Sequence, residues 1–133
     1  MNIALILSGG IGTRLGGDIP KQYIEAGGRL IISYCIACLS LHEGIDGIQI
    51  VAAPVWQERI LTCLNGEEAG ERFKEKFRGF SVPGRTRQLS ILNGLKDIGK
   101  YAGTADCVLI HDGARPLLTE KLISGCLEAV EGQ

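Results

Sequence analysis

The sequence predicts an α/β fold in which helices cover both faces of a mainly parallel sheet. Short apolar segments rich in β-branched residues alternate along the chain with longer segments that repeat apolar residues at helical spacing. Strands joined through helices in this way run parallel, and their right-handed crossovers place helices on both sides of the sheet. A chain of 133 residues with 45% hydrophobic content suits one domain, residues 1–133, that buries roughly two-thirds of its unfolded surface.

Four apolar segments are the expected strands. The first is Ile3–Leu7, and the second, Gly47–Ala52, is rich in β-branched residues. Gly79–Val82 is a shorter third strand, and Asp106–Ile110 is the fourth. Ligands of parallel sheets bind beyond the carboxyl ends of the strands, so a site is expected in the loops that follow these segments.

Helical segments separate the strands. The expected helices are Leu30–Ser40, Val55–Leu64, Gln88–Ile98 and Thr119–Val130. The last of them is expected to bury one face, made of Leu122, Ile123, Cys126, Leu127 and Val130. The charged stretch Asn65–Arg78 is predicted to be a surface helix, with Phe73 and Phe77 one turn apart as a small apolar stripe.

Charge and cysteine content exclude several classes of protein. The 14 basic and 15 acidic residues nearly balance and form no basic tract, which argues against nucleic-acid and membrane-surface partners. No apolar run reaches the ~18 residues of a membrane span and no signal peptide is present, so a cytoplasmic location is expected. Five cysteines, an odd number, indicate free thiols. Cys35 and Cys38 have C-x-x-C spacing, but their helical stretch is apolar and no second ligand pair exists, so both are predicted to be core residues.

A glycine-rich segment, Ser8–Lys21, follows the first strand and predicts a phosphate site. Its glycines let backbone N–H groups approach an anion, and successive N–H groups form a phosphate-sized nest. Arg14 and Lys21 add charge that could neutralise a polyphosphate. Neither common glycine motif is met, because Leu15 replaces the last glycine of G-x-G-x-x-G and Asp18 replaces the lysine of a P-loop. The alternative is a tight turn that uses glycine for geometry alone.

Two further loops carry candidate residues. Asp112 follows the end of the fourth strand, where its carboxylate could hold Mg²⁺ beside phosphates or simply form a turn. Arg115 could pair with phosphate or with Asp112, and His111 is interpreted as a packing residue. In the segment 84–90, Gly84 permits close approach of a flat ligand at the start of a helix, where free N–H donors lie. Helix capping by Thr86 is the alternative reading of that segment.

Four motifs, in order through nearly the whole chain, combine these features. They are LSGGIGTRL from Leu7, PKQY from Pro20, GRTRQLSI from Gly84 and IHDGARP from Ile110. Together they resemble the 2-C-methyl-D-erythritol 4-phosphate cytidylyltransferase family of the non-mevalonate isoprenoid pathway. The resemblance implies a three-layer Rossmann-like nucleotidyltransferase fold of the nucleotide-diphospho-sugar transferase type. It also implies that CTP and Mg²⁺ are used to make a CDP-linked alcohol and pyrophosphate.

The resemblance assigns roles to residues by motif. It implies nucleotide contacts for Leu7, Ser8, Gly9, Gly10, Gly12, Gly84, Arg85, Ser90 and Gly113. Gly84, Arg85 and Ser90 would face the cytosine, and Gly113 would lie at the ribose. Arg14 and Lys21 would contact the triphosphate and stabilise the transition state. Asp112 would hold Mg²⁺, with Arg115 in a supporting role.

The chain also departs from the family pattern. Pro83 stands where a second glycine is usual, Leu89 where an acidic residue is frequent, and Arg85 is not the commonest residue beside the base. Family members continue for nearly as much again, and that part carries acceptor-binding residues, a further metal ligand and the arm used for homodimer formation. A truncated form of the fold is therefore expected. The alternatives are a cytidylyltransferase for ribitol 5-phosphate or another polyol phosphate, a CTP-binding module without catalysis, and an α/β scaffold without nucleotide.

Overall fold

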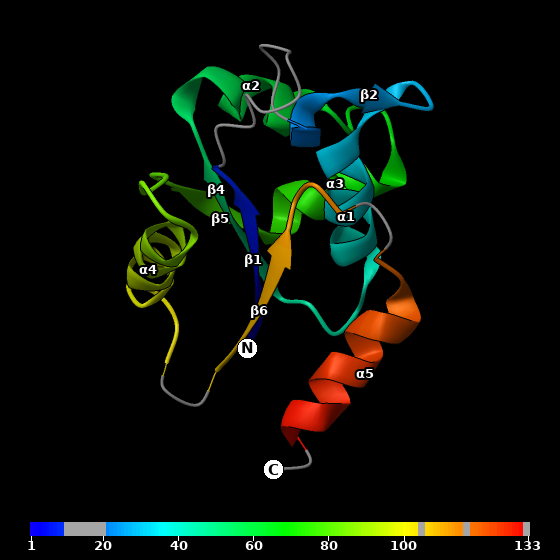
Figure 1. Cartoon of the computed structure of the whole chain (residues 1–133). Helices are drawn as coiled ribbons and strands as arrows, with labels where there is room; N and C mark the ends of the chain where they lie inside the picture. Colours follow the sequence, from blue (N-terminus) through cyan, green and yellow to red (C-terminus); the bar gives the residue numbers. More distant parts are fainter. Residues whose placement is uncertain (10–20, 104–105, 116–117, 132–133) are drawn as a thin grey trace.

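The central sheet is four-stranded and parallel in the computed structural model, which describes residues 1–9, 21–103, 106–115 and 118–131 (Figure 1). Its strands are β1 (Asn2–Ser8), β4 (Gly47–Ala52), β5 (Phe77–Ser81) and β6 (Cys107–Asp112). Their order is β5-β4-β1-β6, which places β1 and β4 in the interior of the sheet. The predicted α/β fold is confirmed, and each expected strand is present.

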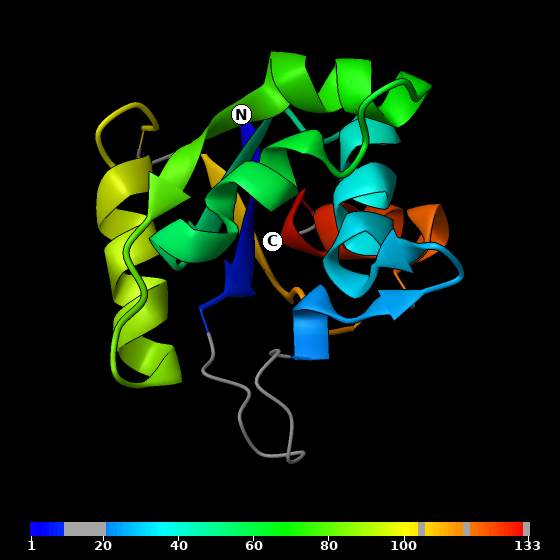
Figure 2. The ribbon, with the colours of Figure 1, turned by 90° about the horizontal axis from the view of Figure 1, so that it is seen from above.

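Helices cover both faces of this sheet (Figure 2). One face carries α4 (Arg87–Ile98), and the other carries α1 (Ile31–Leu41), α2 (Pro54–Thr62), α3 (Glu68–Lys76) and α5 (Glu120–Glu131). The alternation of side chains along β1 explains the division. Ala4 and Ile6 belong to the larger core, whereas Leu5 belongs to the core beneath α4. In the described ranges no helix has both the length and the apolar character of a membrane span.

A 3-10 helix and a small hairpin precede α1 and go beyond the predicted elements. They are η2 (Lys21–Tyr23), β2 (Glu25–Ala26) and β3 (Arg29–Leu30). Gly27 and Gly28, between the two strands, both have positive φ, 64° and 83°. A type I′ hairpin turn needs positive φ at both central residues, which adjacent glycines provide without strain. The sequence therefore contains the signal for this hairpin.

The helix α5 buries a narrower face than its sequence predicts. Ile123 and Leu127 are buried against the larger core, but Leu122 is 55% exposed and Cys126 is also exposed. The expectation that all of these residues share one buried face was wrong. Leu122 lies in the first turn, where its N–H is bound by the Thr119 hydroxyl at 3.1 Å. The apolar periodicity predicts one wide stripe, whereas among the described side chains of α5 it is Ile123 and Leu127 that are buried in the core.

The charged stretch after α2 forms a helix that is shorter than predicted. Helix α3 ends at Lys76, and Phe77 already begins β5, paired with Ile48 of β4. Phe73 and Phe77 do contact each other, with ring centroids 5.1 Å apart, but across the junction between helix and strand. Phe73 is 2% exposed, so this ring belongs to the core and not to a surface stripe.

The cysteines are free thiols, as their odd number indicates. Cys35 is fully buried in the larger core, and Cys38 is half-buried against the same core. Their prediction as core residues is therefore confirmed. Burial raises the pKa of the Cys35 thiol well above its ordinary range and raises the pKa of Cys63 to about 11.

Thiol labelling is expected to separate Cys35 and Cys63, whose pKa values are raised, from the exposed Cys126. Only the thiolate reacts with iodoacetamide, and a raised pKa keeps a thiol protonated at about pH 8. Cys126 should therefore be alkylated in the folded chain, while Cys35 and Cys63 should react only after unfolding. Mass spectrometry of the labelled peptides checks the order. Labelling of Cys35 at the same rate as Cys126 would contradict this packing.

Candidate functional site

The strand ends bring the three predicted loops to one edge of the sheet. Leu7 of β1 lies between Val51 of β4 and Asp112 of β6 in the strand register. Val51 in turn pairs with Ser81 of β5. The carboxyl ends of β1 and β6 point to the upper edge of the sheet in Figure 1. The loops that leave β1, β5 and β6 therefore start at the same edge of the sheet, as the alternation of strands and helices predicts.

Gly9 brings the loop after β1 into contact with the loop after β5. A Cβ atom added at Gly9 would lie 2.7 Å from Cβ of Pro83 and 3.2 Å from Cγ1 of Val51. Only a residue without a side chain fits at the first of these distances. Two segments far apart in the sequence thus touch at a position that requires glycine.

Gly113 joins the loop after β6 to the same strand end. Its N–H donates to the Leu7 carbonyl at 2.9 Å. A Cβ atom at Gly113 would lie 3.2 Å from that carbonyl oxygen and 3.3 Å from Cδ1 of Ile32 in α1. The backbone at Gly113 is therefore pressed against β1, next to the residue at which the glycine-rich segment begins.

Asp112 shapes the turn in which it lies. Its Oδ1 accepts a hydrogen bond from the Ala114 N–H at 3.0 Å, and its carbonyl accepts from the Arg115 N–H at 3.1 Å. His111 Nε2 lies 3.1 Å from the Arg115 carbonyl, to which it donates. The interpretation of His111 as a structural residue agrees with this bond. A carboxylate has a second oxygen, so Asp112 can bind a further partner while it holds the turn.

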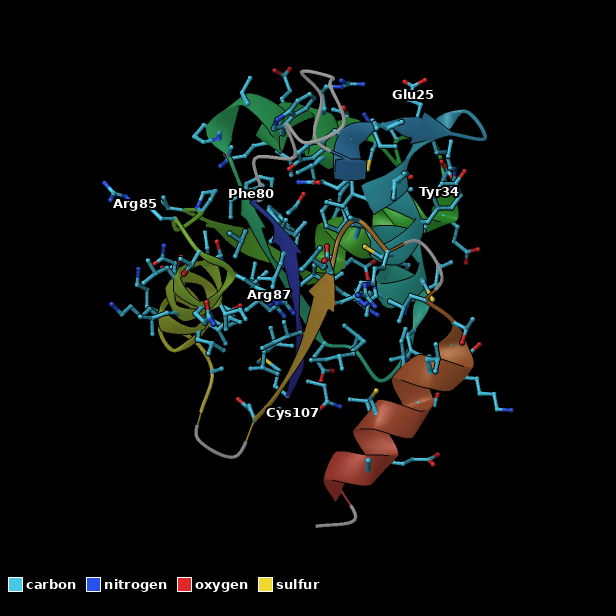
Figure 3. The ribbon with its side chains drawn as sticks, in the orientation of Figure 1. Glu25, Tyr34, Phe80, Arg85, Arg87 and Cys107 are labelled. Carbon is cyan, nitrogen blue, oxygen red and sulfur yellow. The ribbon has the colours of Figure 1, made fainter. Side chains whose placement is uncertain are left out.

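The start of α4 shows the helix cap that was the alternative reading of this segment, and its contact with a nucleotide stays a prediction. The Thr86 hydroxyl accepts from the Leu89 N–H at 3.1 Å, which is a helix cap. The buried Ser90 hydroxyl accepts from the Gly84 N–H at 3.0 Å and holds the loop before the helix. A hydroxyl that accepts one bond can still donate another. Arg85 is exposed and its side chain extends away from the sheet (Figure 3).

A buried hydrogen-bond cluster ties η2 to the end of β1, and no role was assigned to it from the sequence. The Tyr23 hydroxyl donates to the Ser8 carbonyl at 2.8 Å and accepts from the Ser8 hydroxyl at 2.7 Å. Gln22 Nε2 donates to the same carbonyl at 3.1 Å. Burial raises the pKa of Tyr23, and its hydrogen bonds oppose that shift. The sequence marks PKQY only as part of a motif, because no local pattern shows that the tyrosine hydrogen-bonds to the end of β1.

Several predicted site residues cannot be placed. Gly10, Gly12 and Arg14 lie outside the described residues, and Lys21 is described only by its backbone at the start of η2. In the described part, no group of three or more His, Cys, Asp or Glu side chains could hold a metal. Phosphates supply oxygens to Mg²⁺ in nucleotide sites, so Asp112 could share a cation with a bound nucleotide.

Comparison with known families decides the assignment of the chain. The family model described as 2-C-methyl-D-erythritol 4-phosphate cytidylyltransferase matches residues 2–133. The chain belongs to this family. Its members are nucleotidyltransferase enzymes, and the resemblance found in the sequence motifs is confirmed.

Curated members of this cytidylyltransferase family differ in the name of their acceptor. The 2-C-methyl-D-erythritol 4-phosphate cytidylyltransferase of Cupriavidus pinatubonensis is 40% identical over 96% of this chain and 50% of its own length. The ribitol-5-phosphate cytidylyltransferase of Vibrio parahaemolyticus is 35% identical over 98% of this chain and 53% of its own length. The chain spans about half the length of the curated relatives it matches.

Solved structures of the cytidylyltransferase family share this fold. The crystal structure of 4-diphosphocytidyl-2C-methyl-D-erythritol synthase from Anaerococcus prevotii matches with a TM-score of 0.72 and 28% identity, over 97% of this chain and 50% of that one. The structure of Francisella tularensis 2-C-methyl-D-erythritol 4-phosphate cytidylyltransferase also gives 0.72, with 23% identity over 99% and 52%. The described sheet and helices therefore correspond to about half of a nucleotidyltransferase fold.

Proposed function

We propose that this chain binds CTP at the carboxyl edge of its sheet, as part of an enzyme that transfers CMP to 2-C-methyl-D-erythritol 4-phosphate and releases pyrophosphate. The observation that carries the proposal is the meeting of three loops at the end of β1. Gly9 touches the Pro83 side chain, and the Gly113 N–H donates to the Leu7 carbonyl, so the loops after β5 and β6 both contact the end of β1. Family membership supports CTP as the ligand.

The roles of the site residues follow from their types. Glycine backbone after β1 would cradle the triphosphate, with the cations Arg14 and Lys21 beside it. Gly84, Ser90 and the backbone of Arg85 would face the cytosine, since the Arg85 side chain extends away from the sheet, and Gly113 would face the ribose. The Leu7 and Ser8 carbonyls already accept hydrogen bonds from Gly113 and from Tyr23, so they would contact the nucleotide through other atoms of these residues.

The reaction requires that the two substrates are positioned and that the charge of the transition state is stabilised. A phosphate oxygen of the acceptor attacks the α-phosphorus of CTP, a new P–O bond forms, and the bond to the β-phosphate breaks. Negative charge gathers on the α-phosphate oxygens, and cations held ready for it stabilise that state more than the ground state. Mg²⁺, held by Asp112 together with phosphate oxygens, would neutralise the departing pyrophosphate. Arg115 would support this side of the site.

Two other functions remain candidates. Ribitol 5-phosphate is an alternative acceptor, because relatives of similar identity carry that name and the acceptor residues of the family lie in the half that this chain does not match. A CTP-binding module without catalysis is the other candidate, because the chain spans about half the length of its relatives.

Two experiments test these functions together. The first is a calorimetric titration with CTP in excess Mg²⁺, and the second is an assay with radiolabelled CTP and each polyol phosphate. We expect CTP to bind and to raise the melting temperature, because a ligand that binds only the folded state stabilises it. Labelled CDP-alcohol identifies the acceptor, and binding without product identifies the module. A chain that shows no Mg²⁺-dependent effect of CTP would refute the nucleotide site.

A further inference from the structure

We propose that Tyr23 is a positioning residue that fixes the end of the glycine-rich segment, and with it Lys21, against β1 for binding of the triphosphate. The inference rests on the proposed function. It assigns a specific task to a residue that makes no expected contact with the nucleotide.

The first support is the closed hydrogen-bond pair between Tyr23 and Ser8. Tyr23 is 2% exposed, and its hydroxyl donates to the Ser8 carbonyl at 2.8 Å and accepts from the Ser8 hydroxyl at 2.7 Å. Ser8 ends β1, so the tyrosine connects the two ends of the segment between β1 and η2. A buried hydroxyl that both donates and accepts is fully satisfied and resists displacement.

The second support is the surface against which the ring packs. Tyr23 stacks on Trp56 of α2, with centroids 4.3 Å apart and ring planes 12° apart. Helix α2 starts directly after β4, and Gln57 of this helix donates to the Ala52 carbonyl at 3.2 Å. The guanidinium of Arg59 also lies over the Trp56 ring, 5.5 Å from its centroid. The ring of Tyr23 is thus held by β4 through α2, while its hydroxyl is held by β1.

The consequence for Lys21 follows from chain geometry. Lys21 and Tyr23 are the first and last residues of η2, and a 3-10 helix rises only about 2 Å per residue. Fixing Tyr23 therefore fixes the backbone of Lys21 near the end of β1. Gly9, next to Ser8 in the chain, lies on the same edge and touches Pro83. The tyrosine would set the spacing between the Lys21 backbone and the Gly9 backbone at this edge of the sheet.

This arrangement predicts a loss that is selective for the triphosphate. Removing the hydroxyl in Tyr23→Phe leaves the ring on Trp56 and the Gln22 bond to the Ser8 carbonyl, but it removes both hydrogen bonds between Tyr23 and Ser8 and so loosens η2 from β1. CTP should bind about five- to tenfold more weakly, because charge-assisted contacts depend on the position of the cation. CMP, which lacks the outer phosphates, should lose less than about twofold. A merely destabilised fold would weaken both ligands alike.

Calorimetry of CTP and CMP in excess Mg²⁺ on three proteins tests the inference: the unaltered chain, Tyr23→Phe and the matched control Tyr101→Phe. The Tyr101 hydroxyl donates to Gln49 Oε1 at 3.0 Å on the α4 face, away from the strand ends. Both variants should melt a few degrees lower, but only Tyr23→Phe should change the ratio of the two dissociation constants. Amide hydrogen exchange in Lys21–Tyr23 should also rise in that variant alone.

Each outcome decides between the role of Tyr23 and the function itself. An unchanged CTP to CMP ratio in Tyr23→Phe overturns the positioning role and leaves the proposed function intact. No CTP binding by the unaltered chain overturns both. If Tyr23→Phe shows no cooperative melting, Trp56→Leu replaces it, since this change removes the ring on which Tyr23 stacks. The same selective loss in Trp56→Leu supports the role, and an equal loss for both ligands overturns it.

Discussion

Lys21→Ala is expected to weaken CTP binding roughly 10- to 100-fold, since a hydrogen bond to a charged group contributes about 1.5–3 kcal/mol. Where the enzyme turns over, the rate should fall by about 10²-fold, as when one preorganised donor to a developing oxyanion is lost. The reason is the proposed place of this cation beside the triphosphate, at the start of the 3-10 helix that is tied to β1. Calorimetry with CTP and a pyrophosphate-release assay measure the two effects.

The matched control is Lys96→Ala. Lys96 lies exposed in the last turn of α4, so its removal takes away the same charge without touching the loops at the strand ends. Its effect on CTP binding should stay within about twofold, because exposed charges at a distance are screened by salt. Arg14→Ala should behave like Lys21→Ala if both cations serve the triphosphate. Near-unaltered affinity in both variants would remove the cations from the proposed site.

The strands and helices were predictable because their periodicities are strong. Gly47–Ala52 is found at the bounds that its run of β-branched residues predicts. Errors arose where tertiary packing overrides local pattern. Phe77 has helical spacing from Phe73. Its backbone nevertheless pairs with Ile48, so Phe77 belongs to strand β5 and not to the helix. In α5, the Leu122 side chain fits the helical stripe but finds no partner surface, which periodicity cannot reveal.

The location of the candidate site was predictable from the sequence, but the contacts that hold its loops in place were not. The order of strands and helices implies that the loops beginning at Ser8, Pro83 and His111 meet, because parallel strands end at the same edge. The close packing of Gly9 on Pro83 and the closure of Tyr23 onto Ser8 depend on distances between residues that are far apart in the chain. No local pattern encodes such distances. The roles of Arg14, Asp112 and Ser90 toward a nucleotide stay predictions.

Gly9→Ala is expected to cost about 1–3 kcal/mol of stability and to weaken CTP binding more than about tenfold. The new Cβ would lie 2.7 Å from Cβ of Pro83, so the loop after β1 or the loop after β5 must move. Gly9 has no positive φ, so the effect is steric and does not come from backbone strain. Thermal unfolding and CTP titration measure the two losses.

A double-mutant cycle with Pro83→Gly isolates this contact. Pro83→Gly removes the atoms that the new Cβ meets, so Gly9→Ala should be less damaging in that background, with a coupling of about 0.5–3 kcal/mol. Rescue should be partial, because Val51 Cγ1 would still lie 3.2 Å from the added atom. Gly125→Ala is the control: nothing lies within 4 Å of a Cβ there, and alanine in a helix should stabilise by about 0.5–1 kcal/mol. Additive effects at Gly9 and Pro83 would mean that the two loops do not press on each other, and the convergence that carries the proposed CTP site would lose its main contact.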